Sequence, residues 1–129
     1  MAGRAIFEYD AEQNIIFTAD RWELKTREDV DEFVREYVKF CSGLKKKVYM
    51  VSDINNFVIH AEVIDYYAEK AGEIINQYLL GFARWGTNNL ARMTVRTTSM
   101  KAKIAPNIYS TRKEAIQAIE EMKKTIERE

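Results

Sequence analysis

The spacing of apolar residues changes repeatedly along this chain, from the short uninterrupted runs of strands to the wider period of amphipathic helices. Runs at 5–9 and 15–19 flank a polar turn and predict a β-hairpin. The run within 47–52 is apolar in consecutive positions and predicts a strand that is buried on both faces. Two more strands are expected at 79–85 and 107–110. Amphipathic segments separate these strands, which limits the chain to folds that alternate the two kinds of element.

Three of the amphipathic segments carry helix signals. Thr26 suits an N-cap, with Asp29 three residues later, and Gly43 suits the stop of that helix. The next helix spans 61–78, where apolar side chains recur on one face. The last helix follows a capping box at 111–114.

Residues 88–103 give conflicting signals. Several of them are β-branched, which weakens helix formation. The spacing nevertheless favours a helix that Pro106 ends, because one side of a helical wheel collects the apolar side chains and one threonine. These residues are Leu90, Met93, Thr97, Met100 and Ile104. We therefore expect a helix over 88–103.

The predicted order of elements is ββαβαβαβα. Strands that alternate with helices form parallel pairs through right-handed crossovers, and the N-terminal hairpin adds an antiparallel edge. A length of 129 residues suits one domain. We therefore expect an α/β fold in a single domain, 1–129, with a mixed, mostly parallel sheet and the strand at 47–52 in its interior.

Two segments resemble the anti-sigma-factor-antagonist-like superfamily, also called STAS or SpoIIAA-like. In "VYMVSDINNFVIHAEVID", Asp53, Ile54 and Phe57 stand where that family has an acid and apolar residues between a strand and a helix. The segment "NIYSTRKEAIQAIEEM" is similar to the family's closing strand and capped helix. Together with the order of elements, the resemblance extends over about 6–122. It implies a SpoIIAA-like fold and a non-enzymatic regulatory module that binds a protein partner in a bacterium.

The sequence departs from this family at the regulatory position. Members in sigma-factor pathways are switched by phosphorylation of a serine or threonine at the start of the helix that follows the acid. Residues 53–86 hold no serine or threonine, and Ala61 and Glu62 lie about where the acceptor would be. That form of phosphorylation switch is therefore excluded. Glu62 either mimics a permanently charged state or only suits the first turn of a helix, where acids are favourable.

Composition and motifs argue against several other classes of function. Twenty Lys and Arg balance twenty Asp and Glu, so a nucleic-acid partner is not expected. No apolar run approaches the roughly 20 residues of a membrane span, and no signal-peptide pattern is present, so we expect a cytoplasmic protein. No Cys and His cluster has metal-ligand spacing and no glycine-rich phosphate loop occurs, so neither a metal nor a cofactor is expected. Cys41 falls on an inner helix face and is expected to be an inert core thiol.

Although the charges of the whole chain balance, one stretch of the sequence is basic. Residues 74–113 hold seven Lys and Arg and no acid. In a helix over 88–103, Arg92, Arg96 and Lys103 lie along one stripe. Such a stripe is a solvated helix face, a pairing partner for acids of the same chain or a second copy, or a surface for an acidic partner. Zero net charge with separated acidic and basic regions favours a homodimer.

The sharpest candidate site lies beyond the ends of two strands. Ligands of parallel sheets bind at the carboxyl ends of strands, and 53–57 and 84–89 follow two strands that we expect to be neighbours. Two helix N-termini there would offer N–H groups to the carboxylate or phosphate of a small anionic or amphipathic ligand. The candidate ligand-binding residues are Asp53, His60, Arg84, Trp85, Thr87, Asn88, Asn89 and Arg92. Alternatively, Arg84 pairs with Asp53 inside the protein, and 86–87 only form a turn.

Two classes of function follow from these residues. The first is a binding or regulatory module that recognises a protein partner or a small anionic ligand. The second is a small enzyme that uses Asp53, His60 and Arg84 for acid–base chemistry, since histidine titrates near neutral pH. An enzyme requires His60 within hydrogen-bond reach of Asp53 or of the wall of a concave pocket, whereas a binding module requires only an exposed patch.

Overall fold

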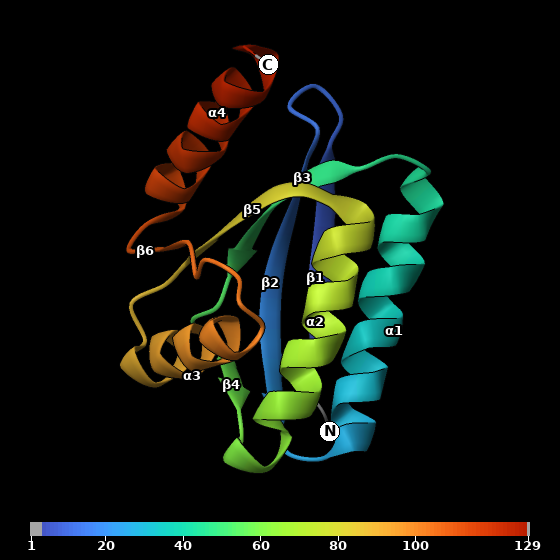
Figure 1. Ribbon diagram of the computed structural model, residues 1–129, viewed down its shortest axis with the longest axis vertical. Coiled ribbons are helices and arrows are strands. Elements are labelled where there is room, and N and C mark those ends of the chain that lie inside the picture. The colour runs from blue at the N-terminus through green and yellow to red at the C-terminus, as the bar shows by residue number, and fades with distance from the viewer. Residues whose placement is uncertain (1–3, 129) are drawn as a thin grey trace.

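The computed structural model describes the backbone of residues 4–128 and the side chains of residues 5–125. Within these residues the chain forms six strands and four α-helices (Figure 1). The strands are β1 (Arg4–Asp10), β2 (Ile15–Leu24), β3 (Val48–Asp53), β4 (Phe57–Ile59), β5 (Leu79–Trp85) and β6 (Ile108–Tyr109). The helices are α1 (Arg27–Leu44), α2 (Ile64–Tyr78), α3 (Asn89–Lys101) and α4 (Arg112–Arg128), and a short 3-10 turn, η1 (Ala61–Val63), precedes α2.

The strands form a mixed sheet in the order β1-β2-β3-β5-β6. β1 pairs antiparallel with β2, and the remaining pairs are parallel, including β4, which pairs with the end of β2. β3 lies between β2 and β5, and its residues 48–52 are buried. The predicted mixed, mostly parallel sheet with β3 in its interior is therefore confirmed.

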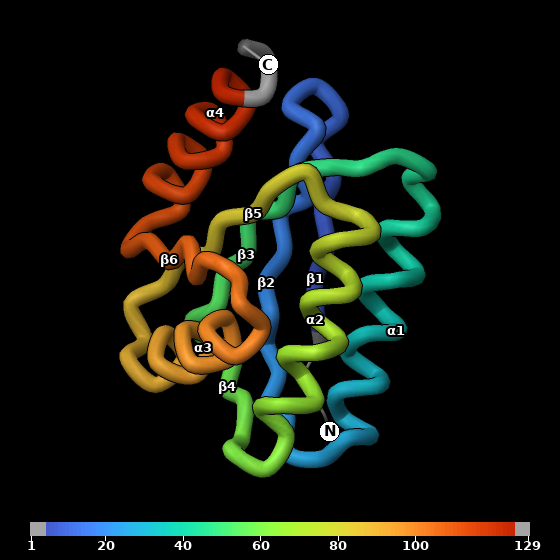
Figure 2. Tube along the Cα trace, in the orientation of Figure 1, coloured from blue at the N-terminus to red at the C-terminus, as the bar shows by residue number. Residues whose placement is uncertain are grey.

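Helices cover the two faces of the sheet unequally. α1 and α2 lie side by side over one face and enclose the larger hydrophobic core (Figure 1). α4 packs against β3 and β5 on the other face and encloses a smaller core. α3 contacts α2 and β4 and lies at the end of the sheet where the parallel strands finish (Figure 2).

The structure contains one strand, β4, that the sequence pattern did not predict, and β2 continues to Leu24, past the predicted end at residue 19. Both differences arise because residues 22–24 of β2 pair with β4. Thr18 and Asp20 of β2 are buried although they are polar, so they interrupt the apolar run. β4 has only three residues, too few to establish a strand period in the sequence.

The start of α1 confirms the predicted N-cap, Thr26, and shows that it forms a capping box with Asp29. The Thr26 hydroxyl accepts a hydrogen bond from the Asp29 N–H, and the Asp29 carboxylate accepts one from the Thr26 N–H, both at 3.1 Å. The predicted stop at Gly43 is wrong, because the helix continues through Gly43 to Leu44. Lys45, with a left-handed φ of 57°, is the C-cap.

The predicted helix over 88–103 is confirmed as α3, but it ends at Lys101, well before Pro106. Lys103 takes a left-handed φ of 59°, and the N–H groups of Lys103 and Ile104 donate to carbonyls of the last turn. This is a Schellman ending, a geometry that glycine usually provides.

The apolar side of α3 faces away from the core. Leu90, Met93 and Met100 expose 50%, 55% and 70% of their surface. The side that packs inward consists of small and β-branched residues, namely Ala91, Thr94, Val95, Thr98 and Ser99. The buried hydroxyls of Thr94 and Thr98 donate to carbonyls one turn earlier in the helix, so their burial leaves no donor unpaired.

Two separate substitutions at the end of α1 should each stabilise the protein. Gly43→Ala should raise the free energy of unfolding by about 0.5–1 kcal/mol, because Gly43 lies inside the helix and an added Cβ meets nothing within 4 Å. Lys45→Gly should also stabilise, by up to about 1 kcal/mol, because glycine adopts the left-handed conformation without strain. Urea unfolding measures both changes, with Lys46→Gly as a control that should bring no gain. A destabilised Gly43→Ala variant would show that the helix stops at Gly43 after all.

Candidate functional site

Polar side chains form a row across the sheet beneath α2. The register places Ile16 of β2 beside Met50 of β3, and Met50 beside Phe82 of β5. Side chains alternate along a strand, so the residues two positions further on point to the same face. These residues are Thr18, Ser52 and Arg84. Asp20 lies two positions after Thr18 on β2 and is also buried. An apolar row is therefore followed by a polar row toward the carboxyl ends of the strands.

Asp20 is a buried carboxyl, with 4% of its surface exposed. The hydroxyl of Tyr37 on α1 donates to this carboxylate and also lies 3.3 Å from Thr18 Oγ1. Burial raises the pKa of Asp20 to about 7, because the hydrogen bond from Tyr37 and the charge of Arg84 offset only part of the desolvation. Asp20 therefore changes its charge close to neutral pH.

Arg84 enters the same space from β5. Its Nη1 donates to the carbonyl of Pro106 at 2.9 Å and to Ser99 Oγ at 3.3 Å, and the guanidinium carbon lies 4.6 Å from the centre of the Phe82 ring. Burial lowers the pKa of this guanidinium, and the neighbouring Tyr67 and Asp20 counteract the shift. Among the ion pairs within residues 5–125, none joins Arg84 to Asp20.

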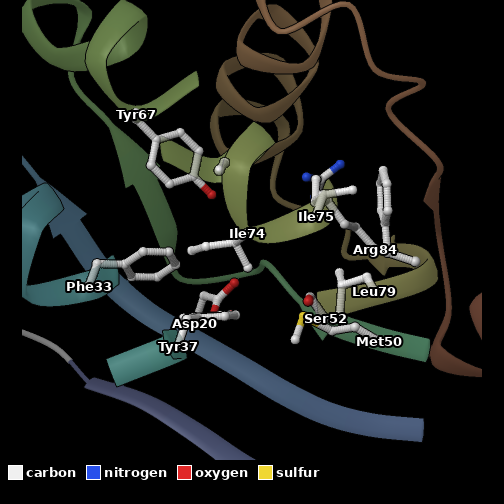
Figure 3. Close-up of a pocket in the computed structure, with 12 residues that line it drawn as sticks. Asp20, Phe33, Tyr37, Met50, Ser52, Tyr67, Ile74, Ile75, Leu79 and Arg84 are labelled. Atoms are coloured by element: carbon white, nitrogen blue, oxygen red, sulfur yellow. The ribbon is translucent and has the colours of Figure 1, made fainter. Parts of the chain in front are cut away.

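The side chains of Asp20 and Arg84 line a cavity of about 40 Å³ (Figure 3). Asp20, Ser52, Tyr67 and Arg84 line it with polar groups, and the Tyr67 hydroxyl points from α2 toward its centre. The rest of the wall is apolar and includes Met50, Ile74, Ile75, Leu79 and Phe82. A space of this size holds roughly two or three water molecules.

Asn55 fills the predicted crevice beyond β3 and β5, which are neighbours as expected. Asp53 Oδ1 accepts from the backbone N–H of Asn55 at 2.9 Å and from its side-chain amide at 2.8 Å. Asn55 Oδ1 in turn accepts from the Thr87 N–H at 2.9 Å, and the Gly86 N–H donates to the carbonyl of Tyr109. These backbone donors therefore already have partners within the chain.

The structure does not bring Arg84 and Asp53 together. Asp53 is in register with Trp85, one position beyond the pair formed by Ser52 and Arg84. Successive side chains point to opposite faces, so Asp53 and Trp85 belong to the face that α4 covers. Trp85 accordingly packs against the smaller core.

Arg92 and the residues before it hold the loop that follows β5. Arg92 Nη1 donates to two carbonyls, those of Gly86 at 2.8 Å and Tyr109 at 3.1 Å. Asn88 is the N-cap of α3, where its side-chain oxygen accepts from a backbone N–H at 3.0 Å. Asn89, the first residue of α3, is exposed.

His60 lies in a third environment, at the end of β4. Its Nε2 is 2.6 Å from a carboxylate oxygen of Glu23, and this hydrogen bond lowers the pKa of Glu23. Both residues border a shallow groove of about 490 Å³ between β4, the start of α2, and α3. Asp53, His60 and Arg84 therefore share no acid–base site within the described side chains.

Sequence reasoning missed the polar residues of the cavity, which are Asp20, Tyr37, Ser52 and Tyr67. The available signal was the alternation of β2, because Trp22 and Leu24 continue the buried positions of Ile16 and Thr18. That alternation makes Asp20 an inward-facing residue once the strand extends past residue 19. Tyr37 and Tyr67 carry no such signal, since aromatic residues on an inner helix face usually only fill a core.

The described residues supply little for metal or thiol chemistry. Within the part of the chain described, no three His, Cys, Asp or Glu side chains group as a metal ion requires. Cys41 is buried, and burial raises the pKa of its thiol to about 11, as befits an inert core residue. None of the described helices is both long and apolar enough to cross a membrane.

Comparison with solved structures defines the fold. The chain is similar to the crystal structure of an anti-sigma factor antagonist from Mycobacterium paratuberculosis, with a TM-score of 0.63 over 91% of this chain and 95% of that one. The two sequences are 9% identical, so the likeness is one of fold. No protein-family model and no curated protein matches the sequence. The single α/β domain thus has the SpoIIAA-like, or STAS, fold that the sequence predicted.

Asp20→Asn should change how the stability of the protein depends on pH. The folded pKa of about 7 exceeds the usual 3.8, so between these values the folded protein retains a proton that the unfolded chain releases. Asp20 therefore removes stability as the pH rises, by up to about 4 kcal/mol for the roughly three units involved.

Asparagine keeps the shape of this side chain but does not ionise. Relative to wild type, the variant should therefore gain stability between about pH 5 and about pH 8. Urea unfolding at both pH values measures this gain, and parallel profiles for the two proteins would contradict it.

Proposed function

We propose that this chain is a non-enzymatic regulatory module that binds a protein partner through the outer side of α3. A structure with the same fold is that of an anti-sigma factor antagonist. A shared fold at 9% identity does not carry a function over by itself, so the proposal depends on the surface of this chain.

The exposed apolar side of α3 carries the proposal. Five large hydrophobic side chains are exposed within the described residues, and Leu90, Met93 and Met100 of α3 are three of them. Their spacing places them on one side of the helix, and Arg96 lies at the edge of that side. We call these four residues the α3 surface. Contiguous apolar side chains on a surface mark sites of interaction with other molecules.

The groove beside α3 extends this surface. Leu90 and Met93 form one wall of the groove, and Val58, Ile59 and Ile64 contribute apolar lining on the side of β4 and α2. A hydrophobic floor with polar residues at its border is the usual arrangement of a protein interface. A partner that covers the α3 surface would also reach this groove.

Charge indicates the chemistry of the partner. Residues 74–113 contain no acid, and Arg96 is exposed and makes no ion pair with a described residue. Lys101 differs, because it pairs with Asp65 of α2 in the same chain at 2.8 Å. Arg96 therefore favours a partner whose apolar side chains are accompanied by an Asp or Glu.

The start of α2 offers the partner a permanent acid rather than a phosphorylation site. Residues 53–86 hold no serine or threonine, and η1 carries the exposed Glu62. Its neighbour Ala61 lines the groove. We infer that a partner covering the groove approaches Glu62 without a need for phosphorylation.

Introducing an acidic residue on the α3 surface, in place of an apolar residue or of arginine, should weaken partner binding. Proteins captured by the wild-type chain from cells that encode it would be purified, and binding to the purified protein would be measured by calorimetry. Met93→Asp should raise the Kd by about tenfold or more, as expected for a residue near the centre of an interface, and Arg96→Glu should raise it by about tenfold because it places an acid where the partner carries one. Both side chains are exposed, so the melting temperature should stay near that of wild type.

Arg35→Glu provides the matched control, because Arg35 is an exposed arginine on α1. This charge reversal should leave the Kd unchanged. Unaltered binding by Met93→Asp and Arg96→Glu would contradict the proposal. It would also be wrong if sedimentation showed a wild-type dimer that Met93→Asp dissociates, since a second copy would then cover the α3 surface.

A further inference from the structure

We propose that the chain forms a symmetric dimer through the free edge of β1, in which two copies of this strand pair antiparallel and join the two sheets into one. Phe7, the central residue of β1, would lie on the two-fold axis. This edge is separate from the α3 surface, and the inference does not depend on the proposed function.

β1 is an open edge of the sheet. It is the outermost strand beside β2, and within the described part of the chain no other strand pairs with it. An antiparallel strand that pairs on one side directs about half of its backbone N–H and carbonyl groups to the other side. Among the described residues, only those of β2 form backbone hydrogen bonds with residues 5–9. β1 therefore offers a row of donors and acceptors to a further strand.

The two edges of the sheet differ in how they are protected. β6, the strand at the opposite edge, has only two residues and is too short to serve as a template for pairing. β1 has seven residues, contains neither proline nor lysine, and pairs with β2 without a bulge. It therefore lacks most of the features by which edge strands avoid pairing with other chains.

The sequence of β1 is complementary to itself in the antiparallel direction. With Phe7 opposite Phe7, all seven residues are paired, and Arg4 stands opposite Asp10 at both ends. Residue types of opposite charge therefore meet twice. Ala5 stands opposite Tyr9, so a small residue faces a large one. The chain has a formal net charge of zero, which removes a barrier to association between two copies.

The face of β1 beneath α1 is only partly covered in a single copy. Ala5, Phe7 and Tyr9 are partly buried against the larger core. The ring of Phe7 stacks on the ring of Phe40 of α1, which is also partly buried, with the ring centres 4.8 Å apart. A second β1 would bring the same aromatic side chains of the other copy to this face. The dimer would therefore extend the larger core and remove further apolar surface from water.

The two copies of α1 have room above the joined sheet. α1 contacts both β1 and β2, so it lies over the outer pair of strands. Neighbouring strands lie about 4.8 Å apart, so two helices centred over the outer pairs would be roughly 10 Å apart, which is close to the distance between packed helices. The second copy therefore meets no obstacle from α1.

A change of charge at one exposed position tests both the dimer and its register. In the proposed pairing Ile6, with 49% of its surface exposed in a single copy, lies opposite Glu8 of the second copy. Ile6→Glu should raise the dimer Kd by about tenfold, because two pairs of like charges would face each other. Ile6→Lys should keep the dimer, because opposite charges would face each other. Sedimentation equilibrium of the full chain measures each Kd.

Two further variants complete the test. The double variant Ile6→Glu, Glu8→Lys restores opposite charges across the seam and should dimerise as wild type does. Leu80→Glu is the matched control, because Leu80 is exposed to a similar extent, 45%, but lies on β5 in the interior of the sheet. This control should leave the Kd unchanged. Circular dichroism shows whether each variant has kept its fold.

The inference is overturned if the wild-type chain remains monomeric at millimolar concentration, a result that leaves the proposed function intact. It is also overturned if folded Ile6→Glu dimerises as tightly as wild type, if Ile6→Lys dissociates the dimer as Ile6→Glu does, or if the double variant does not restore it. A wild-type dimer that Met93→Asp dissociates and Ile6→Glu does not would overturn both this inference and the proposed function.

Discussion

The parallel register of β2, β3 and β5 decides which side chains meet beneath α1 and α2. Backbone hydrogen bonds between the strands place Met50 between Ile16 and Phe82, and Ser52 between Thr18 and Arg84. A shift of one residue would turn every side chain of a strand to the opposite face, so this arrangement is strongly fixed. The core, the polar row and the cavity all follow from it.

The polar row is costly for a protein interior. A buried carboxyl and a guanidinium that do not pair with each other lose much of their hydration, as the raised pKa of Asp20 and the lowered pKa of Arg84 indicate. Tyr37 compensates Asp20, while the carbonyl of Pro106 and the ring of Phe82 compensate Arg84. An apolar row of similar volume would serve stability as well or better, so stability alone does not explain the presence of these groups.

Helices cover the two faces of the sheet in different ways. On one face, α4 packs so closely that a Cβ on Gly81 would lie 2.9 Å from the sulfur of Met122. On the other face, α1 and α2 cover the sheet, while α3 lies at its end and contacts α2 and β4. α3 therefore needs only a narrow inward side of small residues, and its large apolar side chains remain outside. Two sequences that are only 9% identical thus share this fold, and the fold by itself does not determine a function.

Local signals in the sequence determined the elements and their order. These signals depend on residues that are close together in the chain. They are the capping box of Thr26 and Asp29, the helical spacing over 88–103 and the apolar run of the buried strand β3. Such signals predicted the mixed α/β sheet, and the resemblance of two segments to a known family implied its SpoIIAA-like fold. They missed β4, because a three-residue strand is recognisable only by the partner that it meets.

Tertiary structure alone decided the directions in which side chains point. Arg84 lies in the cavity rather than beside Asp53, because the register pairs it with Ser52 and the Pro106 carbonyl accepts its hydrogen bond. Asn55 occupies the predicted crevice through contacts with the loop after β5. A periodic pattern identifies a helix with two unlike sides, but packing against α2 and β4 determined which side of α3 became the inner one. These outcomes depend on segments far apart in the sequence, and no pattern within a few residues records them.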